Sequence, residues 1–532
     1  MKVVYKVCKV IKFIKFIKFI KLKNMKKTFL ILFAIIILGA FLRFYKLGEL
    51  SFVADEFLDM NSSYAYAQTG TWQSWDFNRG VVNVENEFAP RDERAWPYKI
   101  QVAKLFGFFA PTEEVARSIS AVWGILSIIL IFFVAKYFTR KNSIGLLSAF
   151  LFAISVSGII FDRRLRMYAM FFPFFLLFSW LTYKFFEESY GGKLRVFKYV
   201  NEKIGVNLKY ILPMLLSGSM SLKIHDLTVS MVAIFTTYVF IMTTKTFLEK
   251  KTFIWNKYSV TLSVVLVAAA GIFTFASEKI GMYAAGIKFF NDNFSYFSIV
   301  TSDYSHPLLA LLFFVAGIYY LAVHKKLSKE GIWLAVSFLV PLLMAVFLWR
   351  RNAGAQYIFF AQSFAIILIA SGVYGAAKFF KNNLETFSAK KVYFVTIALS
   401  LMLLPNYAYF FQENNAYSQT SAAENPNYRS IFTYFKKKKI DGDVLITRNF
   451  RNYYWSGQNV KVIDFGGELA EEKFSLAQLT NVVNENKTGW VILSDNDDRY
   501  ISNEASVYMQ ENMTKINDIA VRGNVLVYRW GM

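Results

Sequence analysis

The sequence predicts a polytopic α-helical membrane protein with about eleven membrane-spanning helices and a small α/β domain at the C-terminal end. Three observations support this fold class. The 532-residue chain is 55% hydrophobic, it contains many long runs without charge, and its basic residues gather in short stretches between those runs. A helix needs roughly 20 apolar residues to cross a hydrocarbon layer ~30 Å thick. The expected spans are 28–42, 118–137, 143–161, 167–185, 210–222, 227–246, 260–275, 307–323, 331–349, 357–379 and 392–411.

The distribution of charge argues against nucleic acid as a partner, although the formal net charge is +23. If the N-terminus is cytoplasmic, the basic loops between the spans all fall on the cytoplasmic side, as the positive-inside rule requires. An odd number of spans then places the region after residue 411 on the extracytoplasmic side of the plasma membrane. Cys8 is the only cysteine, so the chain cannot form an intrachain disulfide. The basic loops are 136–141, 184–209, 245–257, 324–330 and 378–391.

Three parts are expected along the chain. Residues 1–27 form a basic N-terminal segment, 28–411 form the transmembrane module with a long first outer loop at 43–117, and 412–532 form a soluble extracytoplasmic α/β domain. In the last part, short apolar runs typical of strands alternate with helical segments. The N-terminal segment repeats every three residues. It is either a polybasic lipid anchor or an extension before a natural start at Met25, and we favour the second interpretation.

An acidic pair, Asp55 and Glu56, lies shortly after the first expected span. Carboxylates in this position can face both the lipid and an aqueous phase. Such a group can take a proton from a water-soluble acceptor while the other reactant is held on a lipid. We therefore predict that Asp55 and Glu56 are the catalytic residues.

Two arginine clusters on the expected outer side run against the charge bias of the other loops. An outer arginine can simply extend its long side chain to the lipid headgroups. However, guanidinium groups also bind phosphate bidentately and stay charged where water is scarce. Because two clusters share this side, we predict that they bind a lipid-linked phosphate. The predicted phosphate-binding residues are Arg163, Arg166, Tyr168, Arg350 and Arg351.

Other ionisable residues are candidates for a cavity or acceptor site. His225 lies at the outer end of the fifth span, where an ionisable residue is functional by default, although a histidine that caps a helix explains it equally well. In the first outer loop, Glu85, Glu87, Asp92 and Glu93 could each complete the Asp55 site, and we include Glu93 among the candidates. The metal ligands are unknown from the sequence. The sequence predicts no definite cofactor, and it is compatible with a divalent metal ion.

Several motifs occur in a defined order along most of residues 28–379. They are Arg43-Phe-Tyr-Lys-Leu-Gly48, the Asp55-Glu56 pair, Ala116-Arg-Ser-Ile-Ser-Ala-Val122, Asp162-Arg-Arg-Leu-Arg-Met-Tyr168, and Gln356-Tyr357. In this order they resemble the dolichyl-phosphate-mannose–protein mannosyltransferase family and its bacterial and archaeal relatives, including the lipid A aminoarabinose transferases. That family has the GT-C membrane fold. The chain departs from it at Arg164, where the family often has an acidic residue, and at Gln356, where an arginine is usual.

The resemblance implies a glycosyltransferase. It would transfer a sugar from a polyprenyl-phosphate donor to a protein, lipid or glycan acceptor on the extracytoplasmic side, by a displacement that inverts the anomeric centre. The family's catalytic base in the first outer loop corresponds to Asp55, with Glu56 beside it. The arginine-rich segment corresponds to Arg163, Arg166 and Tyr168. Since Gln356 replaces the usual arginine of the late loop, its phosphate contact falls to Arg350 or Arg351, with Tyr357 lining the cavity.

Other classes of protein fit the sequence less well. A transporter or flippase for lipid-linked sugars would typically show internal repeats and polar residues at the middle of the membrane, whereas here the polar residues gather at the outer boundary. An oligosaccharyltransferase is a GT-C relative, but the nearest string to its Trp-Trp-Asp signature is Tyr453-Tyr-Trp-Ser-Gly457, which lacks the acid. A mere membrane anchor for the C-terminal domain would not need this many spans.

Overall fold

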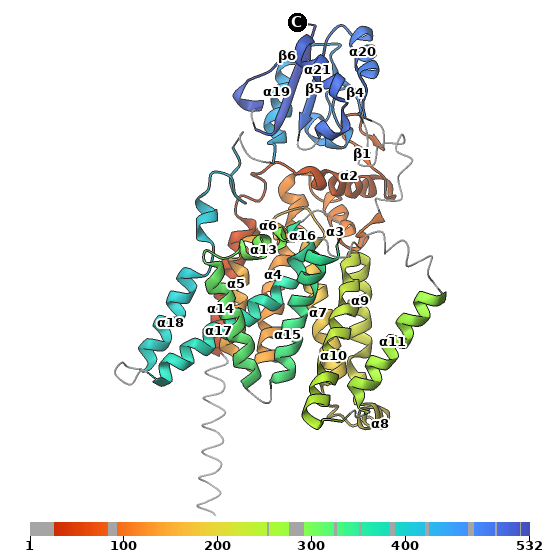
Figure 1. Cartoon of the computed structure of the whole chain (residues 1–532). Coiled ribbons are helices and arrows are strands. Elements are labelled where there is room, and N and C mark those ends of the chain that lie inside the picture. Colours follow the sequence, from red (N-terminus) through yellow and green to blue (C-terminus); the bar gives the residue numbers. More distant parts are fainter. Residues whose placement is uncertain are drawn as a thin grey trace, which may run out of the picture. The chain divides into compact units, whose positions relative to one another are not determined.

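The structure is a computed structural model of the whole chain, and Figure 1 shows it as a ribbon. The residues that it describes are 26–82, 93–252, 255–275, 292–323, 327–349, 354–383, 389–420, 425–465, 473–494, 497–521 and 523–531. The predicted basic segment therefore lies almost wholly outside the described residues. The chain divides into two compact units. A span unit comprises Met1–Arg43, Ala121–Asp162 and Tyr168–Tyr407, and a mixed unit comprises Phe44–Ser120, Arg163–Met167 and Ala408–Met532.

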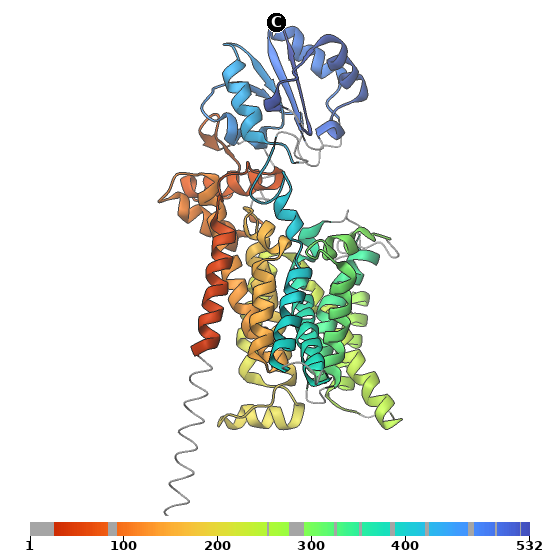
Figure 2. The ribbon, with the colours of Figure 1, turned by 90° about the vertical axis from the view of Figure 1, so that its left-hand side faces the viewer.

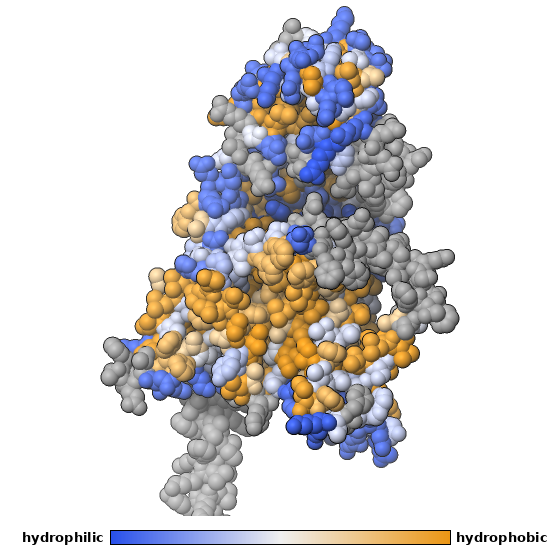
Figure 3. All heavy atoms as spheres, viewed as in Figure 1, coloured by the Kyte–Doolittle hydropathy of each residue, from blue (hydrophilic) through white to orange (hydrophobic). Residues whose placement is uncertain are grey.

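The span unit consists of apolar helices, whose exposed side chains are largely hydrophobic (Figure 3). Among the described residues, six helices are long and apolar enough to cross a membrane, and a bent pair would make a seventh. This content is that of an integral membrane protein. The six are Lys26–Phe44, Glu113–Thr139 (α4), Tyr168–Glu187 (α7), Asp226–Lys250 (η3 and α10), Ser328–Phe347 (α15) and Ala355–Asn383 (α16 to α17); the bent pair is Asn142–Ala153 (α5) with Val156–Asp162 (α6), at 61°.

The remaining predicted spans coincide with further helices. Three of them contain shorter apolar stretches, Lys257–Ala269 in α11 (Lys257–Phe275), Pro307–Val323 (α14) and Lys391–Leu403 in α18 (Ala389–Leu403). The fourth is α9 (Ile211–Ile224). The described residues thus support six or seven spans by length and composition, and the count of eleven stays a prediction.

Glycines allow two of these helices to approach closely. On α14 and α17 (Gln362–Asn383), a Cβ atom at Gly317 would overlap the carbonyl oxygen of Leu368, and one at Gly372 would overlap that of Phe313. The two backbones therefore lie in direct contact, the arrangement that small residues permit between membrane helices. Either substitution would push the helices apart.

A buried ion pair fixes the bend between α5 and α6. Arg43, expected to begin the first outer loop, is instead the buried end of the helix Lys26–Phe44. Its Nε donates to Oδ2 of Asp162 at 2.7 Å, and its Nη1 donates to the carbonyl of Ala153 at 3.0 Å. Because α5 ends at Ala153 and α6 ends at Asp162, one guanidinium holds both helices. A side chain at Gly124 would overlap the Asp162 carboxylate.

The mixed unit contains the first outer loop and the C-terminal residues. The loop folds into α2 (Ala54–Thr69), a two-stranded antiparallel ribbon of β1 (Trp75–Asp76) and β2 (Val81–Val82), and α3 (Trp96–Phe106). The ribbon was not expected, since each of its strands has only two residues.

The C-terminal residues build a five-stranded sheet with the order β4-β3-β5-β7-β6. β3 pairs in parallel with both β4 and β5, and β7 pairs antiparallel with β5 and β6. Helices α20 and α21 supply Leu479 and Met509 to the core on one face, while α19 packs Phe435 against Trp490 of β5 on the other. The elements are α19 (Tyr428–Lys438), β3 (Val444–Ile446), β4 (Lys461–Ile463), α20 (Leu476–Glu485), β5 (Gly489–Ser494), α21 (Asn503–Asn512), β6 (Thr514–Lys515) and β7 (Val525–Trp530).

Long-range contacts make the loop and the C-terminal residues one unit. The backbone N–H of Phe52 donates to the Tyr454 hydroxyl at 2.7 Å, and that hydroxyl donates to the Glu113 carboxylate at 2.9 Å. Arg429 forms an ion pair with the same carboxylate at 2.6 Å. Glu113, at the start of α4, thereby joins the loop to α19 and to the segment around Tyr454. The loop therefore packs with residues far along the chain. The predicted boundary at residue 412 stays a prediction.

Candidate active site

The acidic pair lies in the first turn of α2, within the mixed unit. Helix α2 begins at Ala54, so Asp55 and Glu56 occupy the end of the helix where the free backbone N–H groups favour negative charge. The Glu56 carboxylate folds back and accepts a hydrogen bond from the N–H of Val53 at 2.9 Å. The two neighbouring side chains then diverge into very different surroundings.

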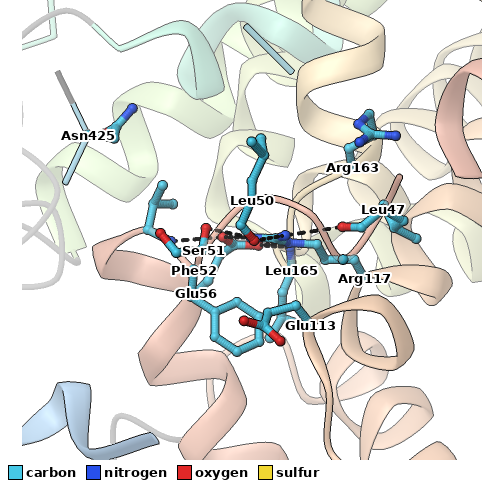
Figure 4. A network of polar contacts seen from close by, with 12 residues as sticks. Leu47, Leu50, Ser51, Phe52, Glu56, Glu113, Arg117, Arg163, Leu165 and Asn425 are labelled. Carbon is cyan, nitrogen blue, oxygen red and sulfur yellow. Dashed lines mark hydrogen bonds and ion pairs between the residues drawn. The ribbon is translucent and has the colours of Figure 1, made fainter. Parts of the chain in front are cut away.

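Glu56 is fully buried in an ion pair with Arg117 (Figure 4). The guanidinium donates to both carboxylate oxygens, from Nε to Oε1 at 2.9 Å and from Nη2 to Oε2 at 2.8 Å. The N–H of Leu165 adds a further hydrogen bond to Oε1 at 2.6 Å. The rest of the guanidinium donates to the carbonyls of Leu47, Leu50 and Ser51, at 3.2, 2.8 and 2.9 Å.

These contacts decide the ionisation of Glu56. Burial alone would raise the pKa of this carboxyl group, but the charge and hydrogen bonds of Arg117, with the N–H groups of Leu165 and Val53, lower it below its usual value of 4.5. Glu56 is therefore held as a carboxylate with all its acceptor capacity used. It fixes α2 against α4 and the segment 163–167 rather than facing an acceptor.

Asp55 has the opposite environment. Its side chain is 51% exposed, and Oδ2 lies 3.2 Å from Nη2 of Arg166. The Nη1 atom of the same guanidinium donates to Asp59 at 2.8 Å and to the backbone carbonyl of Asp55 at 3.2 Å. Asp59 is one helical turn after Asp55, so both carboxylates lie on the face of α2 that meets Arg166. The arginine orients Asp55 while leaving much of its carboxylate open to an approaching reactant.

The arginines of the segment 163–167 differ in their partners. Arg163 donates to the carbonyls of Tyr45, Lys46 and Ala416, at 2.6, 3.0 and 3.0 Å, and lies over the Tyr417 ring at 4.4 Å. It points away from the Glu56 network (Figure 4). Through these contacts Arg163 connects the segment at Tyr45 and Lys46 with the segment at Ala416. Its predicted contact with phosphate stays a prediction.

Arg164 lies between Arg163 and Arg166 in the sequence. Among the described residues, its guanidinium has no carboxylate or carbonyl partner. Burial lowers the pKa of its guanidinium, against the opposing influence of the Glu56 and Asp55 carboxylates. A positive charge that is removed from water in this way is stabilised when an anion binds beside it. The sequence identified this position only as a departure from the family pattern.

The other predicted residues are placed as follows. Tyr168 and His225 belong to the span unit, where their rings pack with centroids 5.4 Å apart, and His225 Nδ1 accepts the N–H of Leu227 at 3.1 Å. Tyr357 also lies in the span unit, in α16 (Ala355–Ile358). Glu93 is exposed in the mixed unit. Arg350, Arg351, Glu85, Glu87 and Asp92 lie outside the described residues.

Sequence reasoning missed Asp59 and Arg117. The spacing of four residues between Asp55 and Asp59 could have indicated a shared helix face. Arg117 was recorded only as part of the Ala116-Arg-Ser motif, because nothing local connects it with a glutamate 61 residues earlier. In the part of the chain that the structure describes, no group of three or more His, Cys, Asp or Glu side chains could hold a metal ion.

Solved structures with similar architecture are membrane glycosyltransferases. The archaeal oligosaccharyltransferase AglB from Archaeoglobus fulgidus, in complex with an inhibitory peptide and a dolichol-phosphate, matches with a TM-score of 0.56 and 11% identity, over 92% of this chain and 73% of that chain. ArnT from Cupriavidus metallidurans, bound to undecaprenyl phosphate, matches with a TM-score of 0.52 and 8% identity, over 93% and 97%. No protein-family model and no curated protein matches the sequence.

These likenesses define the class of the fold. The chain has the GT-C membrane fold, which the resemblance of its motifs implied and the comparisons confirm. The fold is shared with both an oligosaccharyltransferase and an enzyme similar to the predicted family, so it does not by itself distinguish their substrates.

Proposed function

We propose that the chain is a membrane glycosyltransferase that transfers a sugar from a polyprenyl-phosphate donor to an acceptor on the extracytoplasmic side. One observation carries the proposal: Asp55 offers a half-exposed carboxylate beside Arg166 on a fold whose solved examples bind dolichol-phosphate and undecaprenyl phosphate. A transporter or flippase is less well supported, because the exposed carboxylate has a ready use in proton transfer.

Asp55 is the general base of the proposed reaction. As the acceptor hydroxyl attacks the anomeric carbon, Asp55 takes its proton, a role typically worth 10²–10⁴-fold in rate. The new glycosidic bond forms while the bond from that carbon to the phosphate oxygen breaks, and the bonding electron pair leaves with the lipid phosphate. This single displacement inverts the anomeric centre. Arg166 positions Asp55 and does not itself need to touch a substrate.

Arg164 is the best candidate for the residue that binds the departing lipid phosphate. That group gains negative charge as the bond breaks, and a partly buried guanidinium stabilises such charge more strongly than one in open water. Arg166 is committed to two carboxylates and Arg163 to carbonyls, whereas Arg164 has neither kind of partner among the described residues. The predicted contributions of Arg163, Arg166, Tyr168, Arg350 and Arg351 to phosphate binding remain untested beside it.

The test uses the full chain in sealed proteoliposomes with a panel of polyprenyl-phosphate sugars and cell-envelope extract as the source of acceptors. We expect the wild-type chain to release polyprenyl phosphate and the Asp55→Asn variant to lose at least about 10²-fold of that rate. Glu114→Gln is the matched control, because Glu114 is an exposed carboxylate of the same unit. Movement of an intact donor across the bilayer without release of polyprenyl phosphate would instead identify a transporter.

A further inference from the structure

Helix α8 (Arg195–Ile204) lies in the chain between α7, one of the candidate spans, and α9, and it is strongly amphipathic. At 100° per residue, Val196, Val200 and Ile204 fall on one side of the helix, with Phe197 and Tyr199 at its margins. Arg195, Lys198 and Glu202 lie on the opposite side, whereas Lys203 lies beside Val196, where its long side chain can extend past the apolar residues. Over residues 193–209 there are five basic side chains and one acidic side chain, and the basic ones are Lys193, Arg195, Lys198, Lys203 and Lys209.

Among the residues that the structure describes, none covers the apolar side of α8. None of the ten residues of the helix is buried, and the side chains of Val196, Tyr199 and Ile204 are at least 60% exposed. Leu194, just before the helix, is equally exposed. An apolar helix face of this kind is costly in water, so it requires an apolar environment.

The orientation of α8 is fixed by contacts at both of its ends. Asn201 accepts the N–H of Tyr190 at 3.0 Å and donates to the carbonyl of Val206 at 3.1 Å. The N–H of Asn207 donates to the carbonyl of Phe185, near the end of α7, at 2.7 Å. Gly205 ends the helix with a φ of 81°, a conformation that favours glycine. The helix is therefore held close to the end of a span.

The surroundings of α8 match the lipid headgroup layer. In two views at right angles it lies at the ends of the span-unit helices (Figures 1 and 2), where hydrophilic side chains gather (Figure 3). Lys257, at the start of α11, donates to the carbonyl of Phe186 at 2.7 Å, which places the loop before α11 at the same end. That loop exposes Trp255, a residue type enriched at membrane interfaces.

We propose that α8 lies in the headgroup layer of the bilayer, with Val196, Val200 and Ile204 in the acyl boundary and the lysines on anionic phospholipid. The positive charge of the segment favours anionic phospholipid, because basic residues beside an apolar helix face are attracted to anionic lipid. The helix thus gives the enzyme a lipid-selective contact in the leaflet where α7 ends, independent of the proposed sugar transfer.

The sole native cysteine allows a direct test. In a Cys8→Ser background, a nitroxide label is attached at Val196→Cys or, as the matched control on the charged side, at Arg195→Cys. The full chain is placed in nanodiscs of phosphatidylcholine alone or mixed with phosphatidylglycerol. Collision rates with oxygen, which enters lipid, and with a water-soluble nickel chelate report the depth of each label.

We expect the Val196 label to collide severalfold less with nickel than the Arg195 label and to remain accessible to oxygen. Phosphatidylglycerol should deepen the Val196 label, and the combined Lys193→Gln, Lys198→Gln and Lys203→Gln changes should abolish that shift. Equal nickel collision at both positions would overturn the interfacial placement, as would shielding of Val196 from both reagents, which indicates a protein partner. A depth independent of phosphatidylglycerol would overturn the lipid selectivity.

Discussion

Two consecutive carboxylates in one helical turn have opposite environments. Glu56 is fully buried and shares four hydrogen bonds with Arg117, Leu165 and Val53, whereas Asp55 is half-exposed with one arginine contact. A residue that is completely satisfied holds structure, and a residue with open acceptor capacity can react. The sequence predicts both residues as catalytic. The comparison supports our proposal that Asp55 is the base and indicates a structural role for Glu56.

The largest expected effect is on the free energy of unfolding, which the Glu56–Arg117 ion pair should stabilise far more than the Asp55–Arg166 ion pair. Arg117→Ala leaves the Glu56 charge buried without its partner and should cost about 3–5 kcal/mol of unfolding free energy. Asp55→Ala removes a carboxylate that is half in water, leaves Arg166 paired with Asp59, and should cost about 1 kcal/mol or less. Chemical denaturation in detergent micelles measures both. The exposed Arg79→Ala is the control, and equal losses for Arg117→Ala and Asp55→Ala would contradict the assigned roles.

The next effect concerns the donor phosphate. Arg164→Gln removes the guanidinium that we assign to it, and a lost charge-assisted hydrogen bond of about 1.5–3 kcal/mol corresponds to roughly 10–100-fold weaker binding. Binding of undecaprenyl phosphate to the full chain by native mass spectrometry gives the affinity without requiring turnover. Asp55→Asn should leave this affinity within about threefold of wild type. The assignment fails if Arg164→Gln also binds like wild type.

A smaller effect should appear as pH dependence of stability. The pKa of Glu56 is lowered in the folded state, so its ion pair stabilises the fold above the usual value of 4.5 and that contribution is lost as the pH falls through the folded pKa. Unfolding free energies measured from neutral pH into the acid range should therefore fall more steeply for wild type than for Glu56→Gln. Parallel curves would show that Glu56 is not held as a carboxylate.

The smallest effect tests the second partner of Arg166. Asp59→Asn keeps the shape of the side chain and one acceptor oxygen but removes its charge. Arg166 should therefore stay near Asp55, although residue 59 binds it more weakly. We expect turnover to fall by less than about tenfold, or ~1.4 kcal/mol, with an unchanged KM for the donor. A loss as large as that of Asp55→Asn would mean that Asp59 itself takes part in the reaction.

The sequence predicted the parts of this protein that follow local rules. Long apolar runs predicted the helices of the span unit, and the position of Asp55 after the first of them predicted the candidate site, whose catalytic role stays a prediction. It did not reveal that Arg43 is buried against Asp162, because a residue at the end of a hydrophobic run reads as the start of a loop. Nor could it separate Glu56 from Asp55, since the difference depends on Arg117, which is distant in sequence and adjacent in space.

The ion pair between Glu113 and Arg429 and the hydrogen bond between Phe52 and Tyr454 have a consequence for biosynthesis. The partners are 316 and 402 residues apart. At a synthesis rate of about 5–20 residues per second, the first outer loop waits roughly 20–80 s for the chain that completes it. During that interval Glu113 and the Phe52 N–H depend on water or a chaperone. Truncation before Arg429 would remove both Arg429 and Tyr454 and leave these loop groups permanently without their partners.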